Sequence, residues 1–251
     1  MPTLVPSRPA AACALAFSVL LAVAAIGATA ATAEVMIPAG RVAAKLRVVG
    51  AYGKVLAEEK LKTGTTTVPT SPRATCLGAG SGGSGKPATI PGATALGLLG
   101  QAAKSNAALR PLLITDHFSF GLGLCGVGGS VGGEASGLSW YLKLNHVDPE
   151  LGGEAVKLHA GDEVLWALAP FPYPAELALR APHRAKAGKP FEVRVFAYAD
   201  DGTRTPAAGA KVTGAAAPTG ADGRATVTLG KPKRLLARRG KDIPSNRAAV
   251  C

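Results

Sequence analysis

The chain is poor in the residues from which catalytic and metal sites are commonly built. It has four cysteines and four histidines in 251 residues, and it contains no C-x-x-C, no H-x-H or H-E-x-x-H pair and no complete P-loop. These absences argue against a zinc site and against a nucleoside triphosphate enzyme. Aromatic residues make up only 5% of the chain. We therefore expect no catalytic residues, no metal and no bound cofactor, and interpret the chain as a non-enzymatic protein.

The N-terminus has the pattern of an export signal. An apolar run, Ala11 to Ile26, follows Arg8 and gives way to small residues that end in two A-x-A sites. This order predicts a secretory signal peptide over 1–33, cleaved after Ala30 or Ala33. The alternative is an uncleaved anchor, because about 20 apolar residues can span a bilayer. We expect cleavage, a secreted or extracellular protein associated with the cell envelope, and no stable membrane span afterwards.

The cysteines fit an oxidising compartment. Cleavage would remove Cys13 with the signal peptide, whereas the mature protein would keep Cys76, Cys125 and Cys251. Because Cys76 and Cys125 both lie in the first half of the chain, they are the natural disulfide pair. We expect Cys251 to be a frayed, free terminal thiol. The alternatives are a cross-link to another chain or a chain that stops short of its natural end.

The region after the leader, 41–170, predicts a mixed fold. Period-2 alternation indicates strands, and Thr94 is a plausible N-cap for one helix that extends to Asn106. The stretch 78–87 reads as a flexible loop, and the glycine-rich stretch 118–133 as a strand and loop. The expected strands cover 42–49, 55–61, 112–115, 138–144 and 162–168. The order strand, strand, helix, strand, strand predicts a β-grasp, which is a mixed sheet curled around one helix.

Three prolines lie within 170–174, and the sequence after them has a different pattern, in which short strands alternate with turns. Proline removes a backbone donor and stiffens an extended segment, so we expect a linker over 171–176. Beyond it, 177–251 reads as a small immunoglobulin-like β-sandwich, because short strands alternate with turns and no helix is predicted. The fold class is thus mainly β (α+β). The expected strands here cover 177–179, 191–198, 210–213, 224–229 and 233–239.

Several short motifs carry a family resemblance. In the first half they are K-L-R-V-V-G, A-T-A-L-G-L-L, S-W-Y-L-K-L-N and G-D-E-V-L-W, at 45–50, 93–99, 139–145 and 161–166. Together they resemble a domain family of unknown function that is similar to the C-terminal β domain of transcobalamin, within the soluble ligand-binding β-grasp group. The motifs at 206–212, 219–225 and 240–247 are similar to Ig-like modules of secreted actinobacterial proteins. The resemblance implies small-molecule binding, and cobalamin is a ligand by resemblance only.

One strand suggests where a ligand could bind. Side chains alternate between the two faces of a strand, so the Trp and Leu side chains of 138–144 share one face. If that face packs on the helix, Tyr141, Lys143, Asn145 and His146 face outward. Of these, Tyr141, Asn145 and His146 could contact a flat ligand. The alternative is that they are ordinary residues of the sheet.

The net charge of +12 favours anionic partners. A basic run near the C-terminus could dock onto anionic cell-envelope polymers, with a steep salt dependence. The alternative is the solvated face of the last strands. We do not expect nucleic acid as a partner, because no recognised binding motif is present. The basic residues of this run are Lys231, Lys233, Arg234, Arg238, Arg239 and Lys241.

Taken together, these features favour a secreted, non-enzymatic ligand-binding or interaction protein of the cell envelope. The alternative is a structural or adhesive envelope protein without a small ligand, in which both domains act as spacers.

Overall fold

The computed structural model describes residues 41–251, and this part of the chain is mainly β with one α-helix. The expected fold class is confirmed at that level. The predicted signal peptide, Cys13 and both cleavage sites lie outside the described residues.

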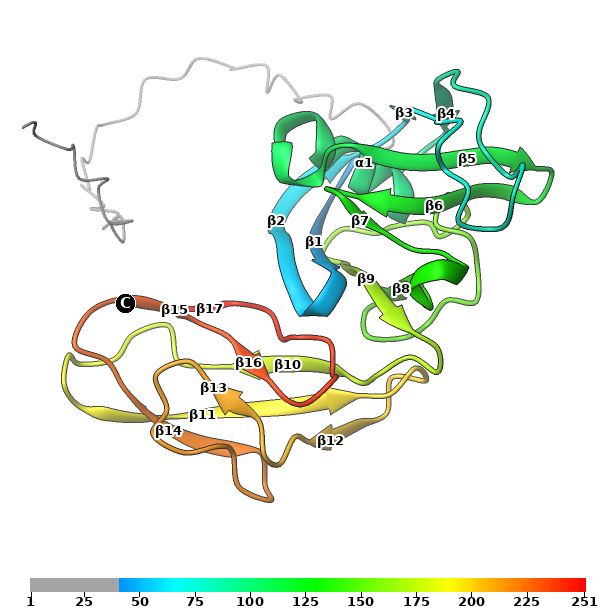
Figure 1. Cartoon of the computed structure of the whole chain (residues 1–251). Helices are drawn as coiled ribbons and strands as arrows, with labels where there is room; N and C mark the ends of the chain where they lie inside the picture. Colours follow the sequence, from blue (N-terminus) through cyan, green and yellow to red (C-terminus); the bar gives the residue numbers. More distant parts are fainter. Residues whose placement is uncertain (1–40) are drawn as a thin grey trace, which may run out of the picture.

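A four-stranded mixed sheet forms the centre of the first half (Figure 1). Strands β1 (Val42–Gly50) and β2 (Lys54–Thr63) form a hairpin. Strand β9 (Glu163–Pro170) lies parallel to β1, and β8 (Leu138–Leu144) lies antiparallel to β9. The strand order is therefore β2-β1-β9-β8. A strand was expected at each of these four places, over 42–49, 55–61, 138–144 and 162–168.

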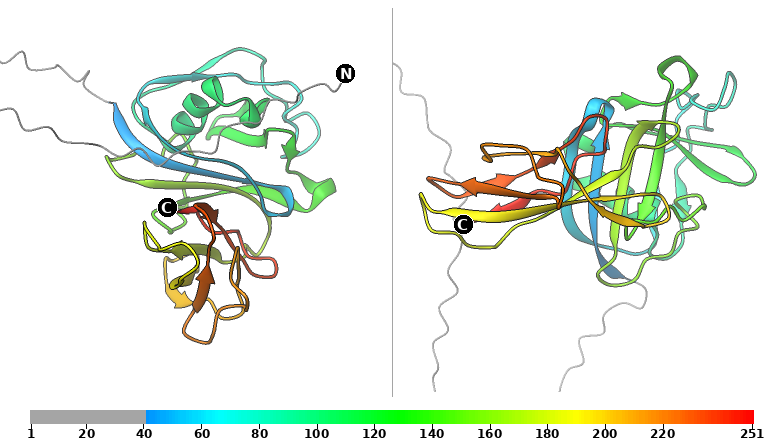
Figure 2. Two further views of the ribbon diagram at one scale, coloured as in Figure 1. Left: turned by 90° about the vertical axis from the view of Figure 1, so that its left-hand side faces the viewer. Right: turned by 90° about the horizontal axis from the view of Figure 1, so that it is seen from below.

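The helix α1 (Ala95–Ser105) covers one face of this sheet, and the second half of the chain lies on the other face (Figure 2). Thr94 caps the helix, because its hydroxyl accepts a hydrogen bond from the Gly97 N–H at 3.1 Å. The Trp166 indole donates to the Ala95 carbonyl at 3.3 Å and fixes the start of the helix on β9. Gly100 lets α1 approach its neighbour closely, since a Cβ there would lie 2.4 Å from Val68 Cγ1.

Shorter strands complete the first half. Strands β3 (Thr66–Val68) and β4 (Ala88–Ile90) pair with each other, and β5 (Leu112–Phe118), β6 (Gly121–Val127) and β7 (Ser130–Val131) form a three-stranded sheet. Cys125 on β6 is joined to Cys76 by the expected disulfide, with the Cα atoms 5.3 Å apart. The cross-link ties the long 69–87 segment to this sheet.

The second half contains only strands as regular elements. A sheet of β10 (Glu176–Arg180), β11 (Pro190–Tyr198), β12 (Arg204–Pro206) and β14 (Arg224–Thr228) is accompanied by two short pairs. These pairs are β13 (Lys211–Val212) with β16 (Ala237–Arg238), and β15 (Lys233–Leu235) with β17 (Ala248–Val250). The strand expected over 233–239 is thus two strands with different partners. Apolar side chains from these strands form a core of their own.

The C-terminal residue is well held. The Cys251 N–H donates to the His183 carbonyl at 3.0 Å, and its carbonyl accepts from the Ala185 N–H at 2.9 Å. The described residues include no free cysteine. The expectation of a frayed, free thiol at Cys251 is therefore wrong.

The two halves share a packed junction. Tyr173, in the proline-rich segment, stacks on Tyr141 of β8 with the ring centroids 4.0 Å apart. Its hydroxyl lies 3.0 Å from Ser139 Oγ. Val49 and Ile243 belong to the same small apolar cluster. The segment expected as a stiff, extended spacer therefore packs on the sheet, and the second half is held against the first.

Candidate functional site

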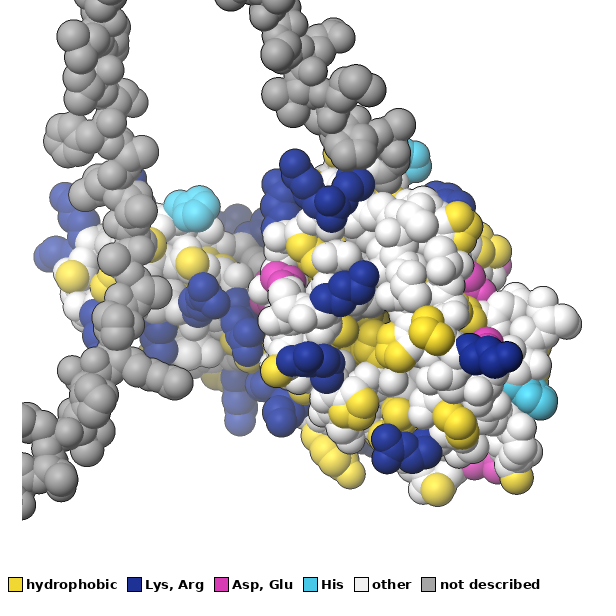
Figure 3. All heavy atoms as spheres, turned by 90° about the horizontal axis from the view of Figure 1, so that it is seen from above, with side chains coloured by type: hydrophobic (Ala, Val, Ile, Leu, Met, Phe, Trp, Pro, Cys, Tyr) yellow, Lys and Arg dark blue, Asp and Glu magenta, His cyan; other side chains and the backbone are white. Residues whose placement is uncertain are grey.

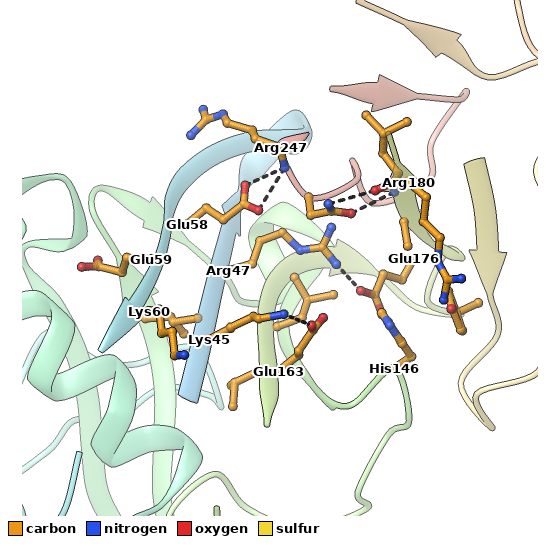
Figure 4. Close-up of a pocket in the computed structure, with 17 residues that line it drawn as sticks. Lys45, Arg47, Glu58, Glu59, Lys60, His146, Glu163, Glu176, Arg180 and Arg247 are labelled. Carbon is orange, nitrogen blue, oxygen red and sulfur yellow. Dashed lines mark hydrogen bonds and ion pairs between the residues drawn. The ribbon is translucent and has the colours of Figure 1, made fainter. Parts of the chain in front are cut away.

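The face of the central sheet opposite α1 carries charged side chains. Residues paired across a sheet point to the same side, and Lys45 on β1 is paired with Lys60 on β2 and with Glu163 on β9. Arg47 is paired with Glu58 in the same way. The second half covers one end of this face. The other end is left open as a cleft of about 520 Å³ between β1, β2 and β9 on one side and β10, β11 and the 246–247 segment on the other (Figure 4).

A buried ion pair closes the inner end of this cleft. The Arg47 guanidinium donates to the Glu176 carboxylate and, through Nη1, to the carbonyls of Leu177 at 3.1 Å and Pro244 at 2.9 Å. His146 Nδ1 lies 3.0 Å from the second Glu176 oxygen. Within residues 41–251, neither of these two atoms has any other hydrogen-bond partner. The pair is therefore satisfied only when Nδ1 carries a hydrogen and donates it to the carboxylate.

Glu176 stays ionised because its surroundings supply positive charge. Burial alone would raise the pKa of this carboxyl. The hydrogen bond from His146 and the charges of Arg47, His146 and Lys143 outweigh burial, and the pKa lies below its usual value. The His146 ring also stacks on Tyr198, with the centroids 3.8 Å apart. The inner end of the cleft is thus a rigid polar wall.

The other carboxylates that line the cleft also have partners. Glu163 pairs with Lys45 at 2.5 Å. Glu58 accepts two hydrogen bonds from the Arg247 backbone N–H, at 2.8 and 3.0 Å. Burial raises the pKa of Glu58, although this N–H and the nearby arginines act against the shift. Glu59 accepts from the Asn106 amide at 3.3 Å.

Three basic side chains of the cleft lack an ion-pair partner among the described residues. Within the described chain, the side chains of Lys60, Arg180 and Arg247 form no ion pair, although all three line the cleft. The Arg180 guanidinium lies over the Phe196 ring, 5.4 Å from its centroid. Each carboxylate of the cleft thus has an ion-pair or hydrogen-bond partner, whereas these three basic side chains have no ion pair among the described residues. The charge of Arg247 does act on Glu58, whose pKa it helps to lower.

The residues predicted as a ligand face are not brought together. Tyr141 and Lys143 were expected to face outward, and this expectation is wrong, because the second half covers them. The Tyr141 hydroxyl donates to Asp200 Oδ1 at 2.5 Å, and its burial together with Asp200 raises its pKa. The Lys143 ammonium is fully buried and donates to the Ala199 carbonyl at 2.6 Å.

Asn145 and His146 have different surroundings. Asn145 is exposed, but its amide is committed to a turn: Nδ2 donates to Asp162 Oδ1, and Oδ1 accepts from the Glu163 N–H, both at 2.9 Å. Its φ of 50° belongs to that turn. Among Tyr141, Asn145 and His146, only His146 lines the cleft.

The basic run lies on β15, β16 and the segments beside them. Most of its side chains are exposed, but Arg239 pairs with Asp242 at 2.6 Å, and Arg238 donates to the Gly53 carbonyl at 2.9 Å. Arg234 lies close enough to Glu58 to lower its pKa. Of the run, only Arg234 is thus shown to act on a carboxylate that lines the cleft.

One short sequence has the pattern of a nucleophile elbow. Residues 128–132 read G-x-S-x-G. The elbow requires a strand followed directly by a helix. Here Gly128 and Gly129 form the turn between β6 and β7, and Ser130 Oγ accepts a hydrogen bond from the Ala51 N–H at 3.4 Å. The glycines thus serve a hairpin, and the serine is not presented as a nucleophile.

Two further features of the described residues bear on function. Across 41–251, no three His, Cys, Asp or Glu side chains are grouped so that they could hold a metal ion. In the same part of the chain, no helix has the length and apolar character that a membrane crossing requires.

Neither a protein-family model, nor a curated protein, nor a solved structure matches the chain.

Proposed function

We propose that the protein is a non-enzymatic binding protein of the cell envelope that holds an anionic ligand in the cleft between its two halves. One observation carries the proposal: the carboxylates of the cleft are partnered, whereas Lys60, Arg180 and Arg247 are not. Ligand sites occur preferentially where two structural units meet. Charge-assisted hydrogen bonds from guanidinium groups suit carboxylate and phosphate ligands.

The proposal includes the fold and the location suggested by the sequence. We infer a β-grasp for the first half, and the strand order β2-β1-β9-β8 with one covering helix supports it. We infer an Ig-like sandwich for the second half, which the paired sheets around a separate core support. Export by the 1–33 leader would place the cleft where anionic polymers of the envelope are available.

The cleft favours a repeating anion over a single small one. Arg234 lies beside Glu58 at the rim, so a chain of phosphates or carboxylates could contact the cleft and the basic run together. Each neutralised charge on a polyanion adds to the salt dependence of binding. We therefore expect affinity to rise with polymer length and to fall steeply with salt.

The test is calorimetric titration of the mature protein with linear polyphosphate and with polygalacturonate at low and moderate salt. The double variant Arg180→Gln/Arg247→Gln should lose at least tenfold in affinity. The matched control, Lys86→Gln/Lys157→Gln, removes two exposed cations that line no described cavity and lie outside the basic run, and it should lose less than threefold. Circular dichroism checks that each variant folds.

Equal losses in both variants would show that binding follows net charge alone and would refute the cleft as the site. Failure of the wild-type protein to bind either polymer would refute the anionic ligand. Stabilisation by cobalamin, tested in parallel by thermal shift, would replace the proposal with the ligand implied by the family resemblance.

A further inference from the structure

A second hollow lies on the opposite side of the first half. It encloses about 690 Å³ between the 67–73 segment, the C-terminal half of α1 and the start of β5. A smaller hollow of about 140 Å³ shares Arg73, Pro111 and Leu113 with it and continues towards β7. The two form one groove, which we call the α1–β5 groove. Its volume falls within the roughly 300–1,000 Å³ of small-molecule sites.

The floor of the α1–β5 groove is apolar. Leu112 and Ala103 are buried beneath it, Leu113 and Pro111 line it, and Val131 is 46% exposed at the far end of the smaller hollow. The apolar lining extends from α1 through Leu113 to Val131 on β7, so an alkyl chain could lie along it.

Three cations stand around this floor, and no carboxylate does. Arg73, Lys104 and Arg110 line the larger hollow, and neither hollow has an Asp or Glu in its lining. In the described chain, these three side chains form no ion pair and no hydrogen bond. Viewed from the side that bears α1 and β5, hydrophobic side chains are flanked by Lys and Arg (Figure 3). The groove thus differs from the cleft, where the acidic residues are present and partnered.

Backbone hydrogen bonds and a disulfide hold the walls of the groove. The Ser71 N–H donates to the Ile114 carbonyl on β5 at 2.8 Å, and the Gly83 N–H donates to the Ser71 carbonyl at 2.8 Å. The Cys76–Cys125 disulfide ties the same segment to β6. Walls that are cross-linked in this way lose little conformational entropy when a ligand binds.

We propose that the α1–β5 groove binds a single-chain anionic amphiphile, with its carboxylate or phosphate head among Arg73, Lys104 and Arg110 and its alkyl tail along Leu113 towards Val131. Burial of each methylene should raise the affinity by up to about fourfold. The charged head should set the orientation of the tail. This site is independent of the cleft proposed above, and the two share no lining residue.

The test is titration of the mature protein with octanoate, decanoate and dodecanoate below their micelle concentrations, and with dodecyl phosphate. We expect affinity to increase at each step in chain length, and acetate and inorganic phosphate to bind at least 100-fold more weakly than dodecanoate. Decanol should bind at least tenfold more weakly than decanoate, because it lacks the charge.

Two variants locate the site. Lys104→Gln/Arg110→Gln, which alters only exposed side chains, should weaken dodecanoate binding at least tenfold. Leu113→Asp should abolish it. The cleft variant Arg180→Gln/Arg247→Gln should bind dodecanoate as the wild type does, so that failure at one site is distinguishable from failure at the other. If Leu113→Asp does not fold, Lys104→Gln/Arg110→Gln still tests whether dodecanoate binds in the groove.

Four results would overturn the proposal. Equal affinity for decanol and decanoate would remove the role of the cations. Equal affinity for acetate and dodecanoate would remove the role of the apolar floor. Binding to anionic phosphatidylglycerol vesicles without binding to free dodecanoate would make the groove a membrane-docking surface instead. Absence of any binding, with the wild type folded, would leave the groove without the proposed ligand.

Discussion

Replacement of Glu176 by glutamine tests the polar wall between the two halves. The side chain is 2% exposed, and it joins Arg47 of the first half to His146. Glu176→Gln keeps the volume and one acceptor oxygen but removes the negative charge. The Arg47 guanidinium then remains buried with neutral acceptors alone, which are the carbonyls of Leu177 and Pro244 and the amide oxygen of the new glutamine.

The expected loss of stability follows from that uncompensated charge. Removal of one partner of a buried ion pair costs roughly 3–5 kcal/mol, and the two remaining carbonyls place this case at about 3 kcal/mol. With a urea m-value of about 2 kcal/mol/M, the unfolding midpoint should fall by about 1.5 M. The measurement is equilibrium urea unfolding at pH 7, followed by circular dichroism and tyrosine fluorescence.

The ionisation of Glu176 also makes the free energy of unfolding depend on pH. The folded pKa of Glu176 lies below its ordinary value of 4.5, so the unfolded state binds the proton more readily than the folded state. Its stabilising contribution is therefore present above about pH 4.5 and is lost as the pH falls through the lower, folded pKa. The difference in free energy of unfolding between wild type and Glu176→Gln should be constant above this window and should shrink on acidification.

A matched double variant provides the control. Arg47→Met/Glu176→Met removes both charges together, so neither is left unpaired, and it should recover at least half of the loss. If the free energy of unfolding of Glu176→Gln lies within 1 kcal/mol of the wild-type value, the reasoning is refuted. The buried ion pair would then contribute no more than an exposed one. A double variant no more stable than Glu176→Gln would also refute the reasoning.

Three further outcomes are expected. Cys76→Ser/Cys125→Ser should lower the free energy of unfolding by about 4 kcal/mol, because the cross-link spans 49 positions, and an unchanged melting temperature would contradict this. Gly100→Ala should destabilise by about 1 kcal/mol in spite of the better helix propensity of alanine, because its Cβ would crowd Val68; a stabilised variant in urea unfolding would be the contrary result. Thr94→Ala should cost about 1 kcal/mol through the lost helix cap, whereas Thr94→Ser should keep most of it, and equal losses in the two would count against the cap.

The sequence predicts the strands where alternation is strong. The strand expected over 138–144 agrees with β8 (Leu138–Leu144) at both ends, because every second residue faces the helix. For β6 the sequence predicts a strand and loop within 118–133 but not its bounds, because glycine carries no side chain to alternate. Gly126 is nonetheless closely packed: a Cβ there would lie 2.9 Å from Leu113 Cδ1, so the leucine side chain would have to shift.

The candidate site was much less predictable. Alternation separates two faces of β8 but does not say what covers either of them. Tyr141 and Lys143 are buried by residues 198–200, which lie more than 50 positions further along the chain. A lysine between leucines reads as a solvent-facing residue, and no local signal indicates the backbone carbonyls that receive its ammonium group. The cleft has the same origin, since its two sides come from distant segments.

The parallel pairing of β1 with β9 has a consequence for the synthesis of the chain. Lys45 and Glu163 are neighbours in the sheet, although 118 positions separate them. A nascent chain therefore exposes one long edge of β1 until most of the first half has been made, and long-range pairing of this kind closes slowly. Any fragment that ends before Glu163 keeps that edge bare, which makes it a target for proteases and for strand-to-strand aggregation.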